Sequence, residues 1–317
     1  ATYAVLLLGN DVYGQNGTND TGIAASAGVE ISANTVRGNY NGIYAGDQTY
    51  LHENRLYDNA NFAINADYDA RILSNYVYSN SVGLHTLASF RGQVFDNLIY
   101  ANTNRGLWLQ NSNASTSPEI VNNTIYQPVG DAVRLDSSAR YVTLRNNLIW
   151  VLSGYDLWVD TNSQNGFTSD YNLLHQGTDV NAHVGSWGNV VRDSLADWQT
   201  ASAQDDHSLA GDPLFVDIDG ADNVLGYVAS PGGGTHGGRD DNFYRAKLSL
   251  AIDRGDPWSA PRTDIEGFPR VDDPGVPNAG GNDYVPSVPG GSSFAASGTA
   301  QNWRSNNTYY TYTLPFA

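Results

Sequence analysis

The chain has 317 residues and a formal net charge of −17. This charge argues against nucleic acids and anionic membrane surfaces as partners, because binding to phosphates requires clustered Lys and Arg. The absence of cysteine excludes disulfides and thiolate metal sites. Abundant Gly, Asn, Asp, Ser and Tyr with few Lys and Glu are typical of an extracellular β-protein.

The first apolar run, Tyr3 to Leu8, is predicted to be a β-strand. It is too short for the hydrophobic core of a signal peptide or for a membrane span. We therefore expect no insertion into a membrane. The chain also contains no methionine, even at position 1. We expect it to be a mature or excised part of a larger protein, so that other domains of the same chain are its partners.

From this strand onward the chain repeats Asn-x-aliphatic, often followed by Tyr, at intervals of 20 to 26 residues. The repeat is clear in ENRLYDNANFAINAD, which begins at Glu53, and in DNLIYANTNRGLWLQ, which begins at Asp96. A period of this length is typical of a stacked solenoid. The anchoring asparagines are Asn10, Asn34, Asn54, Asn75, Asn97, Asn123, Asn147 and Asn172.

An aliphatic residue stands two positions after each anchor, and another stands three positions before it until Ser169 breaks that column. A second short strand follows eight or so residues after the anchor. Strands this short cannot bury a face alone, but stacked coils build a continuous core through parallel pairing. Asn tolerates the left-handed backbone region at a corner, and stacked amides can hydrogen-bond along the column. The repeat therefore predicts an all-β fold, a right-handed parallel β-helix that forms a single-stranded solenoid of about eight coils.

The regular period ends after residue 175, so we predict that residues 1–175 form the coils. Residues 176–284 are Gly- and Asp-rich and are predicted to form an irregular region that caps the helix or packs along it. Residues 285–317 begin with a Pro-, Gly- and Ser-rich stretch and end in a β-like pattern. We interpret them as a linker and the truncated start of another β domain.

Two sets of motifs carry a resemblance to known families. The repeats resemble those of the right-handed parallel β-helix families that include pectate lyases, alginate lyases and mannuronan epimerases. The segments DDHSLAGDPLFVD, LSLAIDRGDP and DIEGFPR, from Asp205, Leu248 and Asp264, resemble the closing region of large secreted bacterial β-helix proteins. The resemblance covers about residues 1–284 and implies a secreted or cell-surface bacterial protein. These families include lyases, hydrolases, epimerases, adhesins and spacers, so the activity stays open.

One column of mainly aromatic residues is expected three positions after each anchor. Such a column can stabilise neighbouring coils through ring stacking, or it can offer a platform for sugar rings. We favour the structural role, because Asn-x-aliphatic-Tyr recurs as a turn signature in such repeats. The column contains Tyr13, Arg37, Tyr57, Tyr78, Tyr100, Tyr126, Trp150 and His175.

A second column, in the later strand of each coil, is chemically mixed. A purely structural ladder would more often repeat one residue type, whereas Tyr, Trp, Arg and His at steps of about 5 Å can bind a glycan by stacking and hydrogen bonding. Ordinary variety on an exposed face explains the column about equally well. It contains Tyr44, Asn65, His85, Trp108, Arg134 and Trp158; all except Asn65 are candidate substrate-binding residues.

An acidic corner follows this row, and it suggests an enzyme as an alternative. Lyases and epimerases of uronate polymers need a group that neutralises the carboxylate, a base and a proton donor. The candidate catalytic residues are His85 with Arg71, Tyr68, Asp67 and Asp69, one coil away. However, the Tyr-Gly-Phe-Asp-Pro-His motif of epimerases is absent, and acidic corners are more often solvated turns.

The segment DIDGADN has the alternating carboxylates and the glycine of an oxygen-rich Ca²⁺ loop. The candidate ligands are Asp217, Asp219 and Asp222, but Val228 stands where an EF-hand requires Glu. A structural or charge-neutralising Ca²⁺ and a simple Asp-rich turn both remain open. We expect His207, in the closing motif, to bond locally to backbone or Asp rather than to a metal.

Three functions are compatible with these observations. The leading hypothesis is an extracellular domain of a larger secreted or surface protein that contacts polysaccharide. The second is a lyase or epimerase that acts on a uronate polymer through His85, Arg71 and nearby Asp residues. The third is a non-catalytic spacer or adhesin module.

Overall fold

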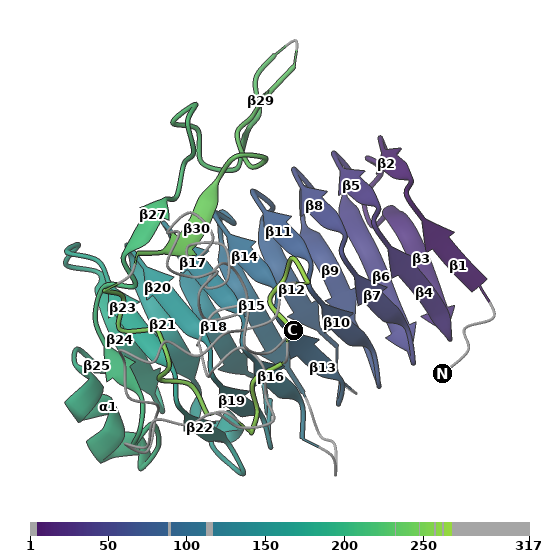
Figure 1. The fold of residues 1–317 in the computed structure, drawn as a ribbon. Helices are drawn as coiled ribbons and strands as arrows, with labels where there is room; N and C mark the ends of the chain where they lie inside the picture. Colours follow the sequence, from purple (N-terminus) through teal and green to yellow (C-terminus); the bar gives the residue numbers. More distant parts are fainter. Residues whose placement is uncertain are drawn as a thin grey trace, which may run out of the picture.

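The computed structural model describes residues 5–87, 90–111, 117–231, 233–246, 248–256, 258–261 and 263–267. Most of these residues form one elongated coil of short strands, and the later part of the described chain lies along one side of it (Figure 1). The predicted linker and following domain, residues 285–317, fall outside the described residues. Among those described, no helix has the length and apolar composition that crossing a membrane would require.

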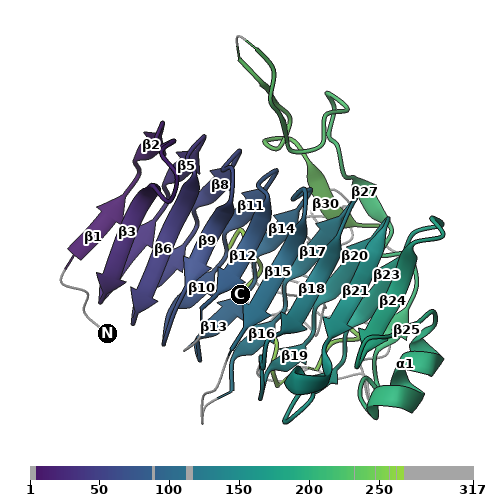
Figure 2. The same cartoon turned by 180° about the vertical axis from the view of Figure 1, so that it is seen from behind.

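Every third strand in the chain belongs to the same sheet, so the coil has three sheets (Figures 1 and 2). The first sheet contains β1 (Val5–Leu8), β4 (Val29–Ser32), β7 (Tyr50–His52), β10 (Arg71–Leu73), β13 (Gln93–Phe95), β16 (Glu119–Val121), β19 (Thr143–Arg145) and β22 (Thr168–Asp170). The second contains β2 (Asp11–Tyr13), β5 (Thr35–Arg37), β8 (Arg55–Tyr57), β11 (Tyr76–Tyr78), β14 (Leu98–Tyr100), β17 (Thr124–Gln127), β20 (Leu148–Val151), β23 (Leu173–Gln176) and β26 (Leu209–Ala210). The third contains β3 (Thr21–Ala27), β6 (Asn41–Asp47), β9 (Phe62–Ala66), β12 (Val82–Thr86), β15 (Arg105–Gln110), β18 (Asp131–Asp136), β21 (Gly154–Val159), β24 (Ala182–Trp187) and β25 (Val190–Arg192).

Parallel pairing holds successive coils together. In the first sheet, eight strands are joined by seven parallel pairings. The aliphatic residues before and after each anchor point into the coil; Ile31, Leu51 and Ile72, for example, have no exposed surface. A single strand of three residues cannot bury its apolar side chains, whereas the stacked coils bury them in one continuous core. The predicted parallel β-solenoid is therefore confirmed.

The anchoring asparagines form a buried ladder along the coil. The Asn54 side chain donates from Nδ2 to Oδ1 of Asn75 at 3.0 Å and to the backbone oxygen of Ile31 in the preceding coil at 2.9 Å. Its backbone N–H donates to the same Asn75 oxygen. Equivalent bonds join the anchors from Asn10 to Asn172. The ladder satisfies backbone groups at a corner that water does not reach.

One expectation about these corners is wrong. The anchors themselves do not adopt the left-handed backbone region; the residue before each does, as in Ala33 (φ 53°), Glu53 (φ 56°) and Ser74 (φ 52°). The preceding residue makes the sharp turn, and the Asn side chain is then free to bond along the coil. Asn is needed for its amide rather than for its tolerance of positive φ.

The coil continues beyond the boundary predicted at residue 175, because β24 pairs in parallel with β21. A short 3₁₀ helix, η1 (Thr161–Ser163), lies between β21 and β22. After β25, which pairs antiparallel with β24, the helix α1 (Leu195–Ser202) packs the buried Trp198 against the last coil. The Ser194 hydroxyl caps its first turn by accepting the backbone N–H of Asp197.

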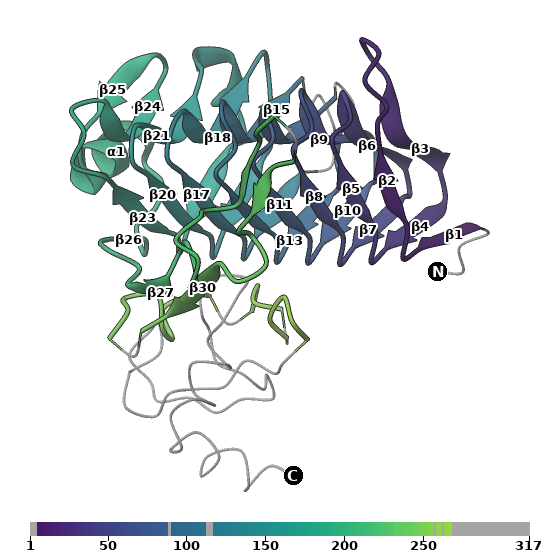
Figure 3. The same cartoon turned by 90° about the horizontal axis from the view of Figure 1, so that it is seen from above.

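The remaining strands form two small antiparallel pairs. β27 (Phe215–Asp217) pairs with β30 (Asn242–Arg245), and β28 (Tyr227–Val228) pairs with β29 (Thr235–His236). In Figure 3, β27 and β30 lie beside the second sheet, on the side of the coil away from β18 and β21 of the third sheet. We call the described residues between 209 and 267 the covering segment.

Candidate functional site

The mixed column predicted from the sequence lies on the outer face of the third sheet. Its members are direct Cα partners in successive coils, in the order Tyr44, Asn65, His85, Trp108, Arg134 and Trp158. We call these six residues the mixed strip. Its members are half-buried, except His85, which is 7% exposed. Since the inward neighbours fill the core, the strip faces away from it.

A chain of hydrogen bonds runs along the strip and its flanks. In His85, Nδ1 lies 2.9 Å from Oδ1 of Asn65, and Nε2 lies 3.1 Å from Oε1 of Gln110. Gln110 in turn donates from Nε2 to Oδ1 of Asp136 at 2.8 Å. The same carboxylate oxygen accepts the indole N–H of Trp108 at 3.1 Å. The strip is thus organised before any ligand arrives.

Burial lowers the pKa of His85, although the hydrogen bond to Gln110 opposes this shift. The neutral ring therefore predominates near neutral pH, and in this form it donates a hydrogen bond from only one of its two nitrogens. The Phe62 ring stacks on the imidazole at 4.5 Å, and the Trp108 ring packs against it in a tilted orientation at 4.8 Å, both between ring centroids. Both nitrogens face side-chain amide groups of the protein, so neither is directed outward at a ligand.

Two arginine–tryptophan pairs follow further along the coil. The Arg105 guanidinium lies 4.2 Å from the Trp108 ring centroid, and that of Arg134 lies 4.1 Å from the Trp158 ring centroid. Such pairs favour a fixed guanidinium orientation. The Trp108 and Trp158 rings therefore each have a face in contact with an arginine of the same sheet. The strip presents polar groups and ring edges to the solvent.

Asp136 is the anionic centre of this face. Burial would raise its pKa, but the hydrogen bonds from Arg134, Gln110 and Trp108 lower it, so the carboxylate is ionised. Arg134 bonds Asp136 from Nε at 2.8 Å and Asp131 from Nη1 at 2.9 Å. Burial alone would lower the pKa of Arg134, and these bonds raise it instead. The arrangement can position hydroxyl and oxyanion groups but offers no unengaged general base.

The candidate catalytic residues are not brought together. Arg71 lies on the first sheet, where Nε donates to Oε1 of Gln93 at 3.1 Å and the guanidinium lies over Tyr50. His85 lies on the third sheet. The expected proximity is wrong, because a coil corner separates the two residues and turns them onto different faces.

The acidic corner has its own partners. Asp69 forms a two-point ion pair with Arg91, at 2.7 and 2.8 Å. Asp67 accepts the backbone N–H of Tyr68, whose side chain is 42% exposed. These contacts fit a turn that is stabilised locally. A proton donor or acceptor for a sugar ring is not evident from them.

The aromatic column lies on the outer face of the second sheet. The covering segment packs on its middle members, Tyr57, Tyr78, Tyr100 and Tyr126, which are buried, whereas Tyr13 is exposed. Tyr57 and Tyr78 stack with centroids 5.3 Å apart, and Tyr78 and Tyr100 with centroids 4.9 Å apart. Phe243 and Ile265 pack on the same cluster. The structural role favoured from the sequence therefore fits the middle of this face, where the rings are buried.

Polar contacts fasten the covering segment to this column. The Tyr78 hydroxyl lies 2.6 Å from Nε2 of His236, and Arg55 donates from Nη1 to the backbone oxygen of Gly238 at 2.6 Å. The backbone N–H of Tyr227 donates to the Ser79 hydroxyl at 2.8 Å. These bonds join residues 148 to 183 positions apart in the chain, which sequence periodicity does not relate.

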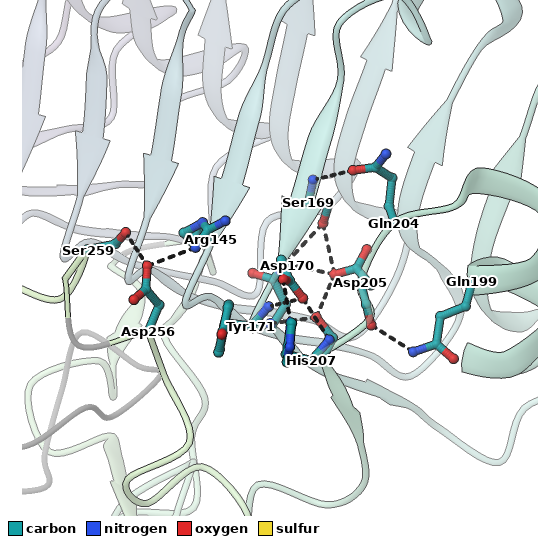
Figure 4. Close-up of polar contacts among 12 residues, drawn as sticks. Arg145, Ser169, Asp170, Tyr171, Gln199, Gln204, Asp205, His207, Asp256 and Ser259 are labelled. Carbon is teal, nitrogen blue, oxygen red and sulfur yellow. Dashed lines mark hydrogen bonds and ion pairs between the residues drawn. The ribbon is translucent and has the colours of Figure 1, made fainter. Parts of the chain in front are cut away.

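The closing motif ends the Asn ladder. The buried Asp205 carboxylate accepts from the Ser169 hydroxyl at 2.9 Å (Figure 4). It also accepts from Asn172 at 3.0 Å, from the Ser208 hydroxyl at 2.6 Å and from the indole of Trp198 at 2.8 Å. His207 pairs through Nδ1 with Asp170 at 2.8 Å (Figure 4). The expectation that His207 bonds locally to an Asp is therefore confirmed.

The candidate calcium ligands lie around the end of β27. Asp222 accepts the backbone N–H of Val224 through Oδ1 at 2.9 Å. Burial, and then the neighbouring Asp219 carboxyl group, raise the pKa of Asp217, which points to two carboxyl groups in close contact. Within the described residues, no three His, Asp or Glu side chains are arranged to hold a metal ion. Calcium at this loop stays a prediction.

Sequence reasoning missed Phe62, Arg105, Gln110 and Asp131 as parts of this face. All four stand two or three positions from a strip residue in the same strand. Alternate residues of a strand share a face, which was an available signal for Gln110, two positions after Trp108. The other three stand three positions from a strip residue, a spacing that simple alternation does not place on the same face.

Comparison with known proteins agrees with the coil. Residues 16–173 match the family model for the right handed beta helix region. A curated protein of Bacillus subtilis (strain 168), named uncharacterized protein YwoF, is 24% identical over 171 residues, and the match covers 49% of this chain and 36% of that relative. The match thus spans little more than a third of the relative's length. No solved structure matches the chain significantly. The family match and the three-sheet coil together support the placement of residues 16–173 in the right-handed β-helix family.

Proposed function

We propose that this chain is an extracellular domain of a larger secreted or surface protein and that it contacts polysaccharide through the mixed strip. One observation carries the proposal. The covering segment packs on the buried middle of the aromatic column, Tyr57 to Tyr126, whereas five of the six strip members on the third sheet are partly exposed. Partly exposed aromatic and polar groups in one row suit a linear hydroxylated polymer.

The electrostatics of the strip support a sugar ligand. Arg105, Arg134, Asp131 and Asp136 balance one another in charge, so this face is locally neutral although the chain carries a net charge of −17. Ordered carboxylate, amide and guanidinium groups at fixed positions form directional hydrogen bonds with hydroxyl groups. The indole edges of Trp108 and Trp158 supply apolar contact for the ring carbons.

The test is a glycan array followed by calorimetric titration of each polymer that binds. We expect Trp108→Ala and Trp158→Ala each to weaken binding by about fivefold or more, the loss of about 1 kcal/mol of contact per ring. Trp258→Ala is the matched control, because Trp258 is 88% exposed and lies outside the strip. Binding that survives both strip variants would contradict the proposal.

The same assays separate the two rival functions. A lyase or epimerase acting through His85 and Arg71 would produce unsaturated uronate absorbance or C5 inversion, and the activity would disappear in His85→Ala. The spacer hypothesis draws support from the strip's own hydrogen bonds, which join its side chains to one another. If no neutral or acidic polymer binds and no uronate is modified, the spacer hypothesis is the one to keep.

A further inference from the structure

Arg105 is a half-buried cation on the outer face of the third sheet. It stands in β15, and its Cα partners in the neighbouring coils are Val82 and Asp131. The guanidinium lies over the Trp108 ring at 4.2 Å from the centroid. This contact holds the guanidinium beside the mixed strip.

The neighbours of Arg105 leave it without a hydrogen bond. Val82 has no polar side-chain atom, and the Asp131 carboxylate accepts from Arg134 instead. Asp136 is occupied by donors from Trp108, Gln110 and Arg134. With the residues that the structure describes, the Arg105 side chain forms no hydrogen bond and no ion pair. Arg134, one coil further, bonds two carboxylates.

An unpaired guanidinium in this position favours an external anion. Burial lowers the pKa of Arg105, and the neighbouring Arg134 lowers it further, while Asp131 and Asp136 act in the opposite direction. An oxyanion offers the planar fork the two-point, charge-assisted bonds that its neighbours do not supply. It would also offset part of the cost of keeping the cation away from water.

We propose that Arg105 is the residue of the strip that recognises an oxyanion, the carboxylate or the sulfate ester of an acidic polysaccharide. This inference rests on the proposed function, since it names the class of polymer that the same face takes. The net charge of −17 opposes the approach of a polyanion. Salt at 0.15 M screens this repulsion over about 8 Å but weakens a direct contact much less.

The experiment uses one polymer backbone in three forms: a neutral cellulose ether, carboxymethyl cellulose and cellulose sulfate of similar chain length. Binding constants are measured by titration calorimetry at fixed salt for the wild type, Arg105→Gln, Arg105→Lys and Arg140→Gln. Arg140→Gln changes the net charge equally at a site outside the strip. Thermal unfolding checks that every variant is folded.

We expect Arg105→Gln to weaken binding of an anionic form by about tenfold and of the neutral form by less than about twofold. Arg105→Lys, which keeps the charge without the fork, should restore part of this loss. Whichever anionic polymer loses more affinity in Arg105→Gln identifies the oxyanion that Arg105 recognises, carboxylate or sulfate. Arg140→Gln should match the wild type.

Three outcomes overturn the inference. Equal losses for neutral and anionic forms would mean that Arg105 contributes only contact area. Unchanged anion binding in Arg105→Gln, with a loss in Trp108→Ala, would reject the inference and leave the proposed function standing. If the wild type binds none of the three forms or any polymer on the array, both proposals fail together.

Discussion

The outer faces of the second and third sheets each carry a row of large side chains, but the two rows differ in composition and burial. Both carry a row of large side chains in strict register from coil to coil. On the second sheet the row is mainly Tyr, and its middle, from Tyr57 to Tyr126, is buried under the covering segment. On the third sheet the row is chemically mixed and partly exposed. A uniform row suits a permanent contact, whereas a mixed row leaves polar groups for a ligand.

The largest expected difference between the faces is in stability. Tyr78→Ala should lower the free energy of unfolding by about 3–5 kcal/mol, because it removes a fully buried ring and two hydrogen bonds under the covering segment. Tyr44→Ala on the open face should cost less than about 1 kcal/mol. Urea denaturation followed by tryptophan fluorescence measures both. Equal costs would erase the distinction between the faces.

The open face has one carboxylate on which its order depends. Asp136→Ala removes the acceptor of Trp108, Gln110 and Arg134, and we expect a loss of about 2 kcal/mol. Asp160→Ala, at the next coil's corner, removes the acceptor of only backbone N–H groups and should cost less. Near-ultraviolet circular dichroism should show loosened Trp packing only in Asp136→Ala; a native spectrum there would contradict the assigned role.

The covered face should respond to pH through Asp241. Burial raises its pKa to about 6, above the ordinary value of 3.8 for an aspartate. The protonated Asp241 therefore contributes to the free energy of unfolding. This contribution is complete below pH 3.8 and is lost as the pH rises through about 6. Asp241→Asn lacks this loss, so the stability of the variant relative to wild type should increase by about 1–2 kcal/mol from pH 4 to 7, after allowance for solvent screening.

The variant Asp241→Asn has to be compared with the wild type because His236 changes the stability with pH in the opposite direction. Burial lowers its pKa from 6.5, so its contribution is lost as the pH falls below that value. Both proteins contain His236, and its effect cancels in the difference between their unfolding midpoints. A difference that is constant with pH would show that Asp241 titrates normally.

The smallest expected effect is that of calcium on the covering segment. If Asp217, Asp219 and Asp222 bind Ca²⁺, a concentration tenfold above the dissociation constant should stabilise this segment by about 1 kcal/mol. Differential scanning calorimetry with Ca²⁺ and with chelator measures the shift, and Asp219→Asn should abolish it. Mg²⁺ serves as the control ion. An identical melting profile with Ca²⁺ and chelator would reject the site.

The fold was accessible from the sequence because its main contacts are between equivalent positions one period apart. The inward column of Ile31, Leu51 and Ile72 and the Asn ladder are both visible as a repeat of 20 to 26 residues. The row from Tyr44 to Trp158 was found in the same way, since a constant offset from the anchor places residues in one column. Nearest-neighbour stacking makes a solenoid nearly one-dimensional, so that a linear pattern describes it.

The candidate site was harder to predict from the sequence, because the repeat period does not show where the chain turns from one sheet to the next. The offset that separates Arg71 from His85 does not reveal that the two lie on different sheets. The left-handed residue before each anchor was assigned to the Asn itself, since both positions belong to the same turn. Gln110 and Arg105 were missed because their roles depend on side chains in the adjacent coil.

By itself, the sequence determined the parallel coil, the order of its columns and the register of the mixed strip, because all three follow from local turns and stacking between neighbouring repeats. Only the tertiary structure decided which outer face is buried. That choice depends on contacts such as Tyr78 with His236, which are 158 positions apart and lie outside the period. The open face, on which both proposals rest, is the one that the covering segment leaves free.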